Sequence, residues 1–152
     1  MDDTAGIFAR KSGYLGRYVQ LGVAQGRVLS VEFPTTVEDD VESDHELLDR
    51  VEAYLEGEKD DFRDVNAAMT MPTPEREVLE KVREIPYGES ATVEQVTRMV
   101  PGRDADDESD LRTVREALAS NPTPIFIPTH RVRDGPGGAP AVESKLRSLE
   151  GL

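Results

Sequence analysis

The segment Met71-Pro72-Thr73-Pro74 divides the chain into two parts with different hydrophobic patterns, and this break constrains the fold most. Two prolines so close together interrupt helices and strands alike, so the segment is predicted to be a linker. Before it, hydrophobic residues first alternate with polar ones, as in strands, and after it they recur with helical spacing. The sequence therefore predicts an α+β protein with one unit at residues 1–71 and a second at residues 72–152.

The N-terminal unit is predicted to hold a β-hairpin followed by a helix. Hydrophobic residues alternate with polar or small ones on both sides of Gln25-Gly26, so residues 17–33 are expected to form the hairpin. An acidic loop follows at residues 38–44. Gly57 is the expected C-cap of the helix, whose buried face carries five hydrophobic side chains: Leu47, Leu48, Val51, Tyr54 and Leu55.

The C-terminal unit begins with a helix and continues with a pair of shorter ones. Thr73 is the expected N-cap of the first helix, with Pro74 at the first helical position, and Pro86-Tyr87-Gly88 ends it. Thr92 and Gln95 form a capping box for a short helix at residues 93–100.

The last helix of this pair follows an acidic turn at residues 103–108. Ser109 is its expected N-cap and Asn121-Pro122 its end, and Arg112 and Arg115 are expected on its outer face. Two short helices joined by a turn, with arginines on the second, form the arrangement of a helix-turn-helix.

Charge is distributed unevenly. The chain has 18 Lys and Arg against 31 Asp and Glu, a net charge of −13, which in general argues against nucleic acid as a partner. Residues 112–133, however, hold four arginines against Glu116 alone. Only four basic residues are lysines and acidic residues occur throughout, a composition that resembles proteins adapted to very salty cytoplasm. There, charges are screened over about 3 Å at 1 M salt, so net charge predicts binding poorly.

Several classes of protein are disfavoured by what the sequence lacks. No apolar run approaches the ~18 residues of a membrane span, and the N-terminus has no signal-like segment, so a cytoplasmic protein is expected. The chain has no cysteine, which excludes disulfides and thiolate metal sites. We expect neither a metal nor a cofactor.

Residues 125–132 read Ile-Phe-Ile-Pro-Thr-His-Arg-Val and follow an Asn121-Pro122-Thr123-Pro124 turn. With Arg112 upstream and Glu150 downstream, this series resembles the active-site region of the alkylguanine-DNA alkyltransferases, whose motif is Pro-Cys-His-Arg-Val. The resemblance covers nearly the whole chain, including the end of the helix at residues 54–58 and the turn at residues 85–89. Thr129 stands at the position of the reactive cysteine.

The resemblance implies a ribonuclease-H-like first domain and a winged helix-turn-helix second domain. In that family a helix enters the minor groove, an arginine replaces an extruded alkylated guanine, and a thiolate accepts the alkyl group. By correspondence, Arg112 would fill the stack, Asn121 would brace the turn, His130 would be the base, and Glu150 would orient it. The DNA-binding residues implied in this way, together with basic neighbours, are Arg112, Thr113, Arg115, Asn121, Arg131 and Arg133.

Three departures from the family pattern bear on activity. A threonine hydroxyl is far less acidic than a thiol, whose pKa starts near ~8.5, so Thr129 is a poor nucleophile near neutral pH. Val93 replaces a tyrosine that helps to rotate the nucleotide, and Asp110 on the recognition helix would face phosphates. The loop at residues 134–140 lacks the Tyr-Ser-Gly-Gly segment that lines the alkyl pocket.

These observations favour a non-catalytic homologue that binds double-stranded DNA, alkylated DNA included, and marks damage for a repair-protein partner without transferring the alkyl group. One alternative is a protein-interaction scaffold that has lost DNA binding. Another is a different transfer or hydrolytic enzyme that uses Thr129, His130 and Glu150. Taken singly, His130 is equally well explained as a structural histidine, and Arg112 is better explained as a solvated charge.

Overall fold

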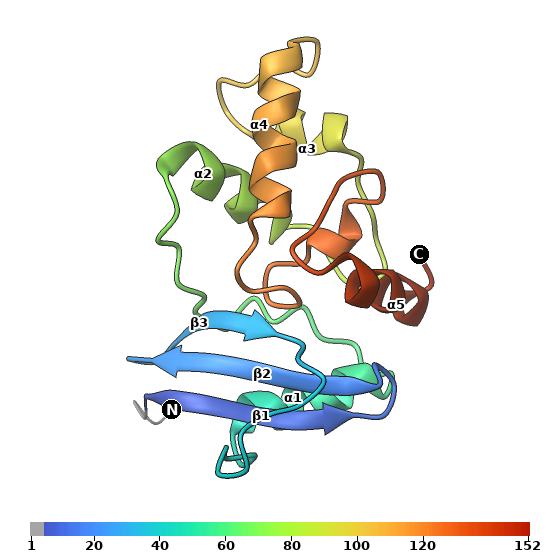
Figure 1. Cartoon of the computed structure of the whole chain (residues 1–152). Coiled ribbons are helices and arrows are strands. Elements are labelled where there is room, and N and C mark those ends of the chain that lie inside the picture. The colour runs from blue at the N-terminus through green and yellow to red at the C-terminus, as the bar shows by residue number, and fades with distance from the viewer. Residues whose placement is uncertain (1–4) are drawn as a thin grey trace.

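The structure, a computed structural model, describes residues 5–152. Figure 1 shows a sheet with α1 packed against it at one end of the molecule and the remaining helices at the other end. The α+β class predicted from the sequence is confirmed. In chain order, the elements are β1 (Gly6–Ser12), β2 (Arg17–Ala24), β3 (Arg27–Glu32), α1 (Glu46–Leu55), α2 (Thr73–Val82), α3 (Val93–Met99), α4 (Glu108–Ala119), the 3₁₀ helix η1 (Thr129–Arg131) and α5 (Pro140–Glu150).

The sheet is antiparallel with strand order β1-β2-β3. The predicted hairpin is confirmed as β2 and β3, and its turn residues Gln25 and Gly26 both have positive φ, at 54° and 72°, which suits a tight hairpin turn. The sequence did not predict β1. Phe8 and Ala9 are buried side by side while Ile7 is exposed, so this strand lacks the alternation that reveals a half-buried strand.

The outer edge of β3 is covered by other segments. Val28 exchanges backbone hydrogen bonds with the segment at residues 66–68, and the Val31 amide donates to the Pro122 carbonyl oxygen at 2.9 Å. Pro122 belongs to the C-terminal half, so this bond joins the two halves through their backbones.

One hydrophobic core lies between the sheet and α1, and it confirms the five predicted helix residues as buried. Four residues of the C-terminal half also belong to this core: Ile125, Phe126, Val142 and Leu146. The unit boundary at residues 71 and 72 remains a prediction, but the first core extends beyond it. Burial of the segment after α4 therefore depends on the N-terminal half.

A second core is formed by α2, α3 and α4, each of which buries its hydrophobic residues there. The Thr92–Gln95 capping box is confirmed. Three predicted caps were wrong. Pro72, not Thr73, precedes α2 and makes no side-chain cap, and Asp107, not Ser109, caps α4. The Asp107 carboxylate accepts from the Ser109 amide, so the helix begins two residues earlier than expected. The C-cap of α1 is Glu56, one residue before Gly57.

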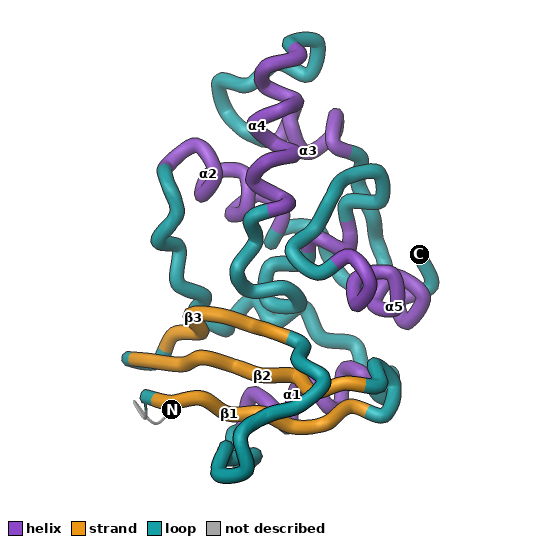
Figure 2. The backbone as a smooth tube through the Cα atoms, viewed as in Figure 1, coloured by secondary structure: helices purple, strands orange, loops and turns teal. Residues whose placement is uncertain are grey.

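Loops dominate the connection between α4 and α5, as Figure 2 shows. The segment before α3 meets this connection at an isolated bridge between Ala91 and Val132. The β1–β2 turn is held against α5, because the Tyr14 hydroxyl donates to the Lys145 carbonyl oxygen at 2.7 Å. Within residues 5–152, no helix is long and apolar enough to cross a membrane.

Candidate functional site

The helix η1 buries three consecutive polar residues, Thr129, His130 and Arg131, at 0–2% exposure. A 3₁₀ helix has three residues per turn, so the three side chains point in different directions around its axis. Thr129 reaches Glu143, whereas His130 and Arg131 both reach Glu150, and the site therefore consists of two polar clusters. We call the one around Glu150 the Glu150 cluster and the one around Glu143 the Glu143 cluster.

The Glu150 cluster is centred on a carboxylate at the end of α5. His130 Nε2 lies 2.6 Å from Glu150 Oε2, so the structure brings together the two residues that the resemblance paired. Burial lowers the pKa of His130, although the neighbouring carboxylate acts in the opposite direction. The ring is therefore neutral near pH 7 and can donate its Nε2–H to Glu150. Within the described part of the chain, His130 Nδ1 has no hydrogen-bond partner.

Glu150 remains ionised in spite of its burial. Burial acts to raise the pKa of Glu150, but hydrogen bonds from His130, Arg131 and the Gly88 amide outweigh it and lower the pKa to about 2. Arg131 Nε lies 2.9 Å from Glu150 Oε1, and the Gly88 amide lies 3.0 Å from the same oxygen. Charge-assisted bonds of this kind stabilise a buried carboxylate strongly.

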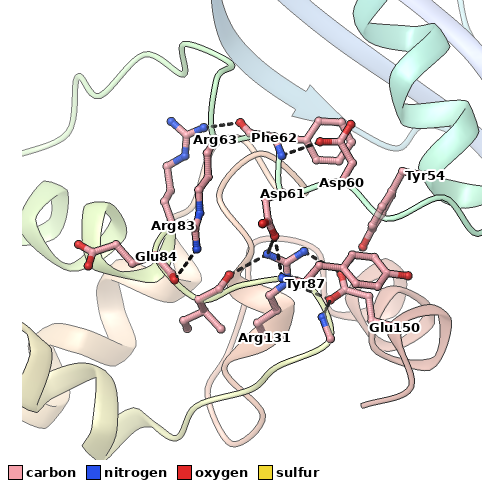
Figure 3. A network of polar contacts seen from close by, with 12 residues as sticks. Tyr54, Asp60, Asp61, Phe62, Arg63, Arg83, Glu84, Tyr87, Arg131 and Glu150 are labelled. Atoms are coloured by element: carbon pink, nitrogen blue, oxygen red, sulfur yellow. Dashed lines mark hydrogen bonds and ion pairs between the residues drawn. The ribbon is translucent and has the colours of Figure 1, made fainter.

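Arg131 is buried and helps to hold the Glu150 cluster together, and its contact with DNA remains a prediction. Its guanidinium is 2% exposed, donates to the Ile85 carbonyl oxygen at 2.8 Å, and lies 3.4 Å from Asp61. It also lies 5.7 Å from the centre of the Tyr87 ring. Figure 3 shows Arg131 close to both Asp61 and Glu150. Arginines are usually exposed, so the sequence alone suggested that Arg131 lies at the surface.

The N-terminal half contributes directly to the Glu150 cluster. The Tyr54 hydroxyl, on α1, donates to Glu150 Oε2, and the Asp61 carboxylate accepts from the Tyr87 amide at 2.6 Å. Burial, followed by the nearby Glu150 charge, raises the pKa of Tyr54, so its hydroxyl keeps the proton it donates. Sequence reasoning took Tyr54 only as a core residue and gave Asp61 no role. No sequence pattern linked either residue to Glu150.

Thr129 belongs to the Glu143 cluster and not to the His130–Glu150 pair. Its hydroxyl donates to Glu143 Oε1 and accepts from Asn121 Nδ2 at 3.0 Å. The triad of Thr129, His130 and Glu150 is therefore incomplete, because the hydroxyl is hydrogen-bonded to other groups. This geometry gives no support to the alternative of a hydrolytic or transfer enzyme, which needs a base beside the nucleophile.

Asn121 is buried and braces the turn, as the resemblance implied. Its side-chain amide donates to the Ile127 carbonyl oxygen at 2.8 Å, and its oxygen accepts from the Thr123 amide at 3.0 Å. Asn121 is 5% exposed, and its contact with DNA remains a prediction. The polar groups that hold the turn together also hold Thr129.

The comparisons with known proteins agree with this geometry. Residues 73–150 match the model of the family described as 6-O-methylguanine DNA methyltransferase, DNA binding domain. A methylated-DNA–protein-cysteine methyltransferase of Methanopyrus kandleri is 38% identical over 109 residues, which are 70% of this chain and 78% of that protein. The chain belongs to the 6-O-methylguanine DNA methyltransferase family.

The fold is shared with solved members of the methyltransferase family. The O6-methylguanine methyltransferase of Mycobacterium tuberculosis superposes with a TM-score of 0.75 at 21% identity, over 97% of this chain and 93% of that one. The M. tuberculosis protein in complex with DNA superposes with a TM-score of 0.70 at 19% identity, over 95% and 92% of the two chains. The present chain has no cysteine, so it lacks the acceptor residue that appears in the name of the protein-cysteine methyltransferases.

The helix α4 presents the candidate DNA-binding residues of this methyltransferase homologue. Arg112 and Arg115 are exposed as expected, and Arg115 Nη1 lies 3.6 Å from Glu108. The Thr113 hydroxyl donates back to the Ser109 carbonyl oxygen at 3.1 Å, and Arg133, beyond η1, is exposed. Arg112, Thr113, Arg115 and Arg133 remain predictions as DNA contacts.

Asp110 is less unfavourable for DNA than its sequence position indicated. Its carboxylate accepts from Arg103 Nη1 at 2.8 Å and from the Asp104 amide at 2.9 Å. The hydrogen bond from Arg103 lowers the pKa of Asp110, so the pair is ionised and its net charge is zero. Asp110 therefore holds the acidic turn against α4, and the Arg103 charge offsets its own.

Proposed function

We propose that this protein binds double-stranded DNA through α4 and does not transfer an alkyl group to itself. The observation that carries the proposal is Thr129, at the acceptor position of a family whose activity needs a cysteine. The hydroxyl is buried and hydrogen-bonded to Asn121 and Glu143, so it has neither the acidity nor the access of a reactive thiolate.

Two findings support DNA as the ligand. The family model that matches residues 73–150 is that of a DNA-binding domain, and the M. tuberculosis relative has been solved in complex with DNA. In addition, Arg112 is exposed on α4 and lies in the part of the sequence where arginines outnumber acidic residues. Exposed arginines on one helix supply the phosphate and groove contacts that such binding needs.

The deciding experiment is duplex binding by fluorescence anisotropy in dilute buffer and in molar potassium chloride. Duplexes with and without an alkylated guanine are compared, because an affinity without its salt concentration cannot be interpreted. Arg112→Ala is expected to weaken binding by about 1–3 kcal/mol without unfolding the protein. The matched control is Arg27→Ala, which removes an exposed arginine from β3 and should leave the affinity unchanged.

Absence of alkyl transfer is tested separately by intact-mass spectrometry after incubation with methylated DNA. The mass of the protein should not increase by a methyl group. A stoichiometric covalent adduct would disprove the non-catalytic assignment. No duplex binding by the parent protein at any salt concentration would instead favour the scaffold alternative, in which the fold serves protein interaction.

A further inference from the structure

The face of the sheet turned away from α1, in front in Figure 1, exposes apolar side chains. The register pairs Ile7 with Gly22 and Gly22 with Ser30, so these three residues form one row across the strands, which we call the Gly22 row. A Cβ atom at Gly22 would lie 2.6 Å from Ser30 Oγ and 3.7 Å from Ile7 Cδ1, so both side chains lie over the glycine on this face. Ile7 is 52% exposed, and Leu29, the additional residue at the register shift beside Gly22, is 46% exposed.

The strands that form this face carry very little negative charge. Residues 5–31 contain no Asp or Glu, although the whole chain has 31 acidic residues. The same residues contain four basic ones, Arg10, Lys11, Arg17 and Arg27. The net charge of −13 makes two copies of the chain repel each other. The Gly22 row therefore offers two copies a surface where this repulsion is small.

Two exposed charges of opposite sign flank the Gly22 row on β3. On one side of the row, Arg27 pairs with Ala24. On the other side, Glu32 pairs with Gln20. Because Ala24 and Gln20 each lie two residues from Gly22 in β2, all of these side chains point to the same face. Arg27 and Glu32 are exposed, and neither has an ion-pair partner among residues 5–152.

We propose that this face is a contact surface between two copies of the chain, related by a two-fold axis along the Gly22 row. In a two-fold contact both copies present the same surface, so every residue pair occurs twice. Rotation about an axis along the row exchanges its two sides, and Arg27 of each copy then lies opposite Glu32 of the other. Ile7 and Leu29 meet between the ion pairs, and Gly22, which has no side chain, allows the two sheets to approach closely.

The contact is small, so the dimer is weak and depends on concentration. Each copy contributes two large apolar side chains and two charges, which is less than the ~800 Å² per partner of a standard interface. Repulsion between the two acidic molecules is screened over about 3 Å at 1 M salt, so association is stronger in molar potassium chloride. At nanomolar concentration the chain is monomeric, and duplex binding through α4 is independent of this surface.

The test is sedimentation equilibrium of the full chain without DNA, from micromolar to millimolar concentration. The wild type is expected to dimerise, more tightly in molar than in about 0.15 M potassium chloride. At the lower salt concentration, Arg27→Glu and Glu32→Arg each place like charges opposite one another at two points. Each should therefore weaken association by about tenfold or more. The double variant restores opposite charges and should recover the association of the wild type.

The matched controls are Lys59→Glu and Glu58→Arg, which make the same changes in net charge at exposed positions after α1 and should leave association unchanged. Circular dichroism establishes that each variant is folded. A wild type that stays monomeric at every concentration and salt, single reversals that behave like their controls, or a double variant that fails to recover overturns the inference. Weaker duplex binding by Arg27→Glu than by Lys59→Glu at nanomolar concentration also overturns it, because the face would then contact DNA.

Discussion

The two ends of α5 each bury one carboxylate, and the two carboxylates are satisfied in different ways. Glu150 is held by the charged Arg131, by His130, by Tyr54 and by the Gly88 amide. Glu143 has two neutral donors, one of them on a loop. The Glu150 cluster joins the halves of the molecule, so it has a structural use that does not depend on a nucleophile.

This difference shows which of the two clusters depends on the residue at position 129. The Glu150 cluster does not depend on the side chain at position 129, because none of its bonds involves that residue. The Glu143 cluster has direct contact with residue 129 and is the place where a new polar arrangement could form. Mutations in the two clusters should therefore have effects that differ in size and in kind.

The largest effect is expected for Glu150→Ala. The substitution leaves Arg131 buried without its carboxylate, and breaking a buried pair in this way costs about 3–5 kcal/mol of unfolding free energy. Urea denaturation monitored by circular dichroism measures the loss. Glu84→Ala, on an exposed acidic residue with a surface ion pair to Lys81, is the control and should change stability by less than about 1 kcal/mol. Equal losses in both variants would refute the structural role of the cluster.

The next largest effect is expected from acid, which should destabilise the protein by protonating Glu150. The pKa of Glu150 is lowered from 4.5 to about 2, so its contribution to stability is complete above pH 4.5 and is lost as the pH falls toward 2. Thermal midpoints measured across that range should fall less steeply in Glu150→Gln, which has no carboxyl group to protonate at this position. A parallel pH dependence in wild type and variant would mean that another group governs acid unfolding.

A smaller loss is expected for Thr129→Val, which preserves shape and removes the hydroxyl. Glu143 Oε1 loses its donor and Asn121 Nδ2 loses one acceptor, a change that costs about 1–3 kcal/mol. The control is Thr113→Val, whose hydroxyl bonds only to the helix backbone and whose loss should cost within about 0.5 kcal/mol. Denaturant midpoints compare the stability of the two variants. A midpoint of Thr129→Val equal to that of the wild type would show that the Glu143 cluster adds nothing to stability.

Local sequence patterns predicted much of the fold. The hairpin at residues 17–33, the inner face of α1, and the Thr92–Gln95 capping box all rest on interactions between near neighbours, which periodicity and capping rules describe. Strand β1 was missed because both of its faces are partly buried, which hides the alternation.

The site was predictable only where the resemblance supplied a partner. The resemblance paired His130 with Glu150, and the structure brings these two residues together, whereas nothing in the sequence pairs Arg131 with residues 61, 85 and 150. Tyr54 lies 96 residues from Glu150 in sequence, and only the packing of α1 against α5 brings them together. Glu143 was missed because a single acidic residue on a helix is usually exposed.

Salt should stabilise the protein through its surface and leave the two clusters unchanged. With 31 acidic against 18 basic residues, repulsion between exposed carboxylates is screened over about 3 Å at 1 M salt. The thermal midpoint should rise between dilute buffer and molar potassium chloride. The differences between wild type and Glu150→Ala should persist, since buried pairs are screened little. A flat response of the wild type would mean that its composition is not a salt adaptation.

The smallest expected effect is the activity gained by Thr129→Cys. The restored thiol would lie beside the Glu143 carboxylate, and a neighbouring negative charge disfavours the thiolate and raises the pKa of the thiol. The loop at residues 135–139 would still cover it. Methyl transfer from methylated DNA, followed by intact-mass spectrometry, should remain close to background in Thr129→Cys. Adding Glu143→Gln removes the charge and should raise the rate of transfer, whereas rapid stoichiometric labelling of the single variant would show that the missing sulfur alone separates this chain from the methyltransferases.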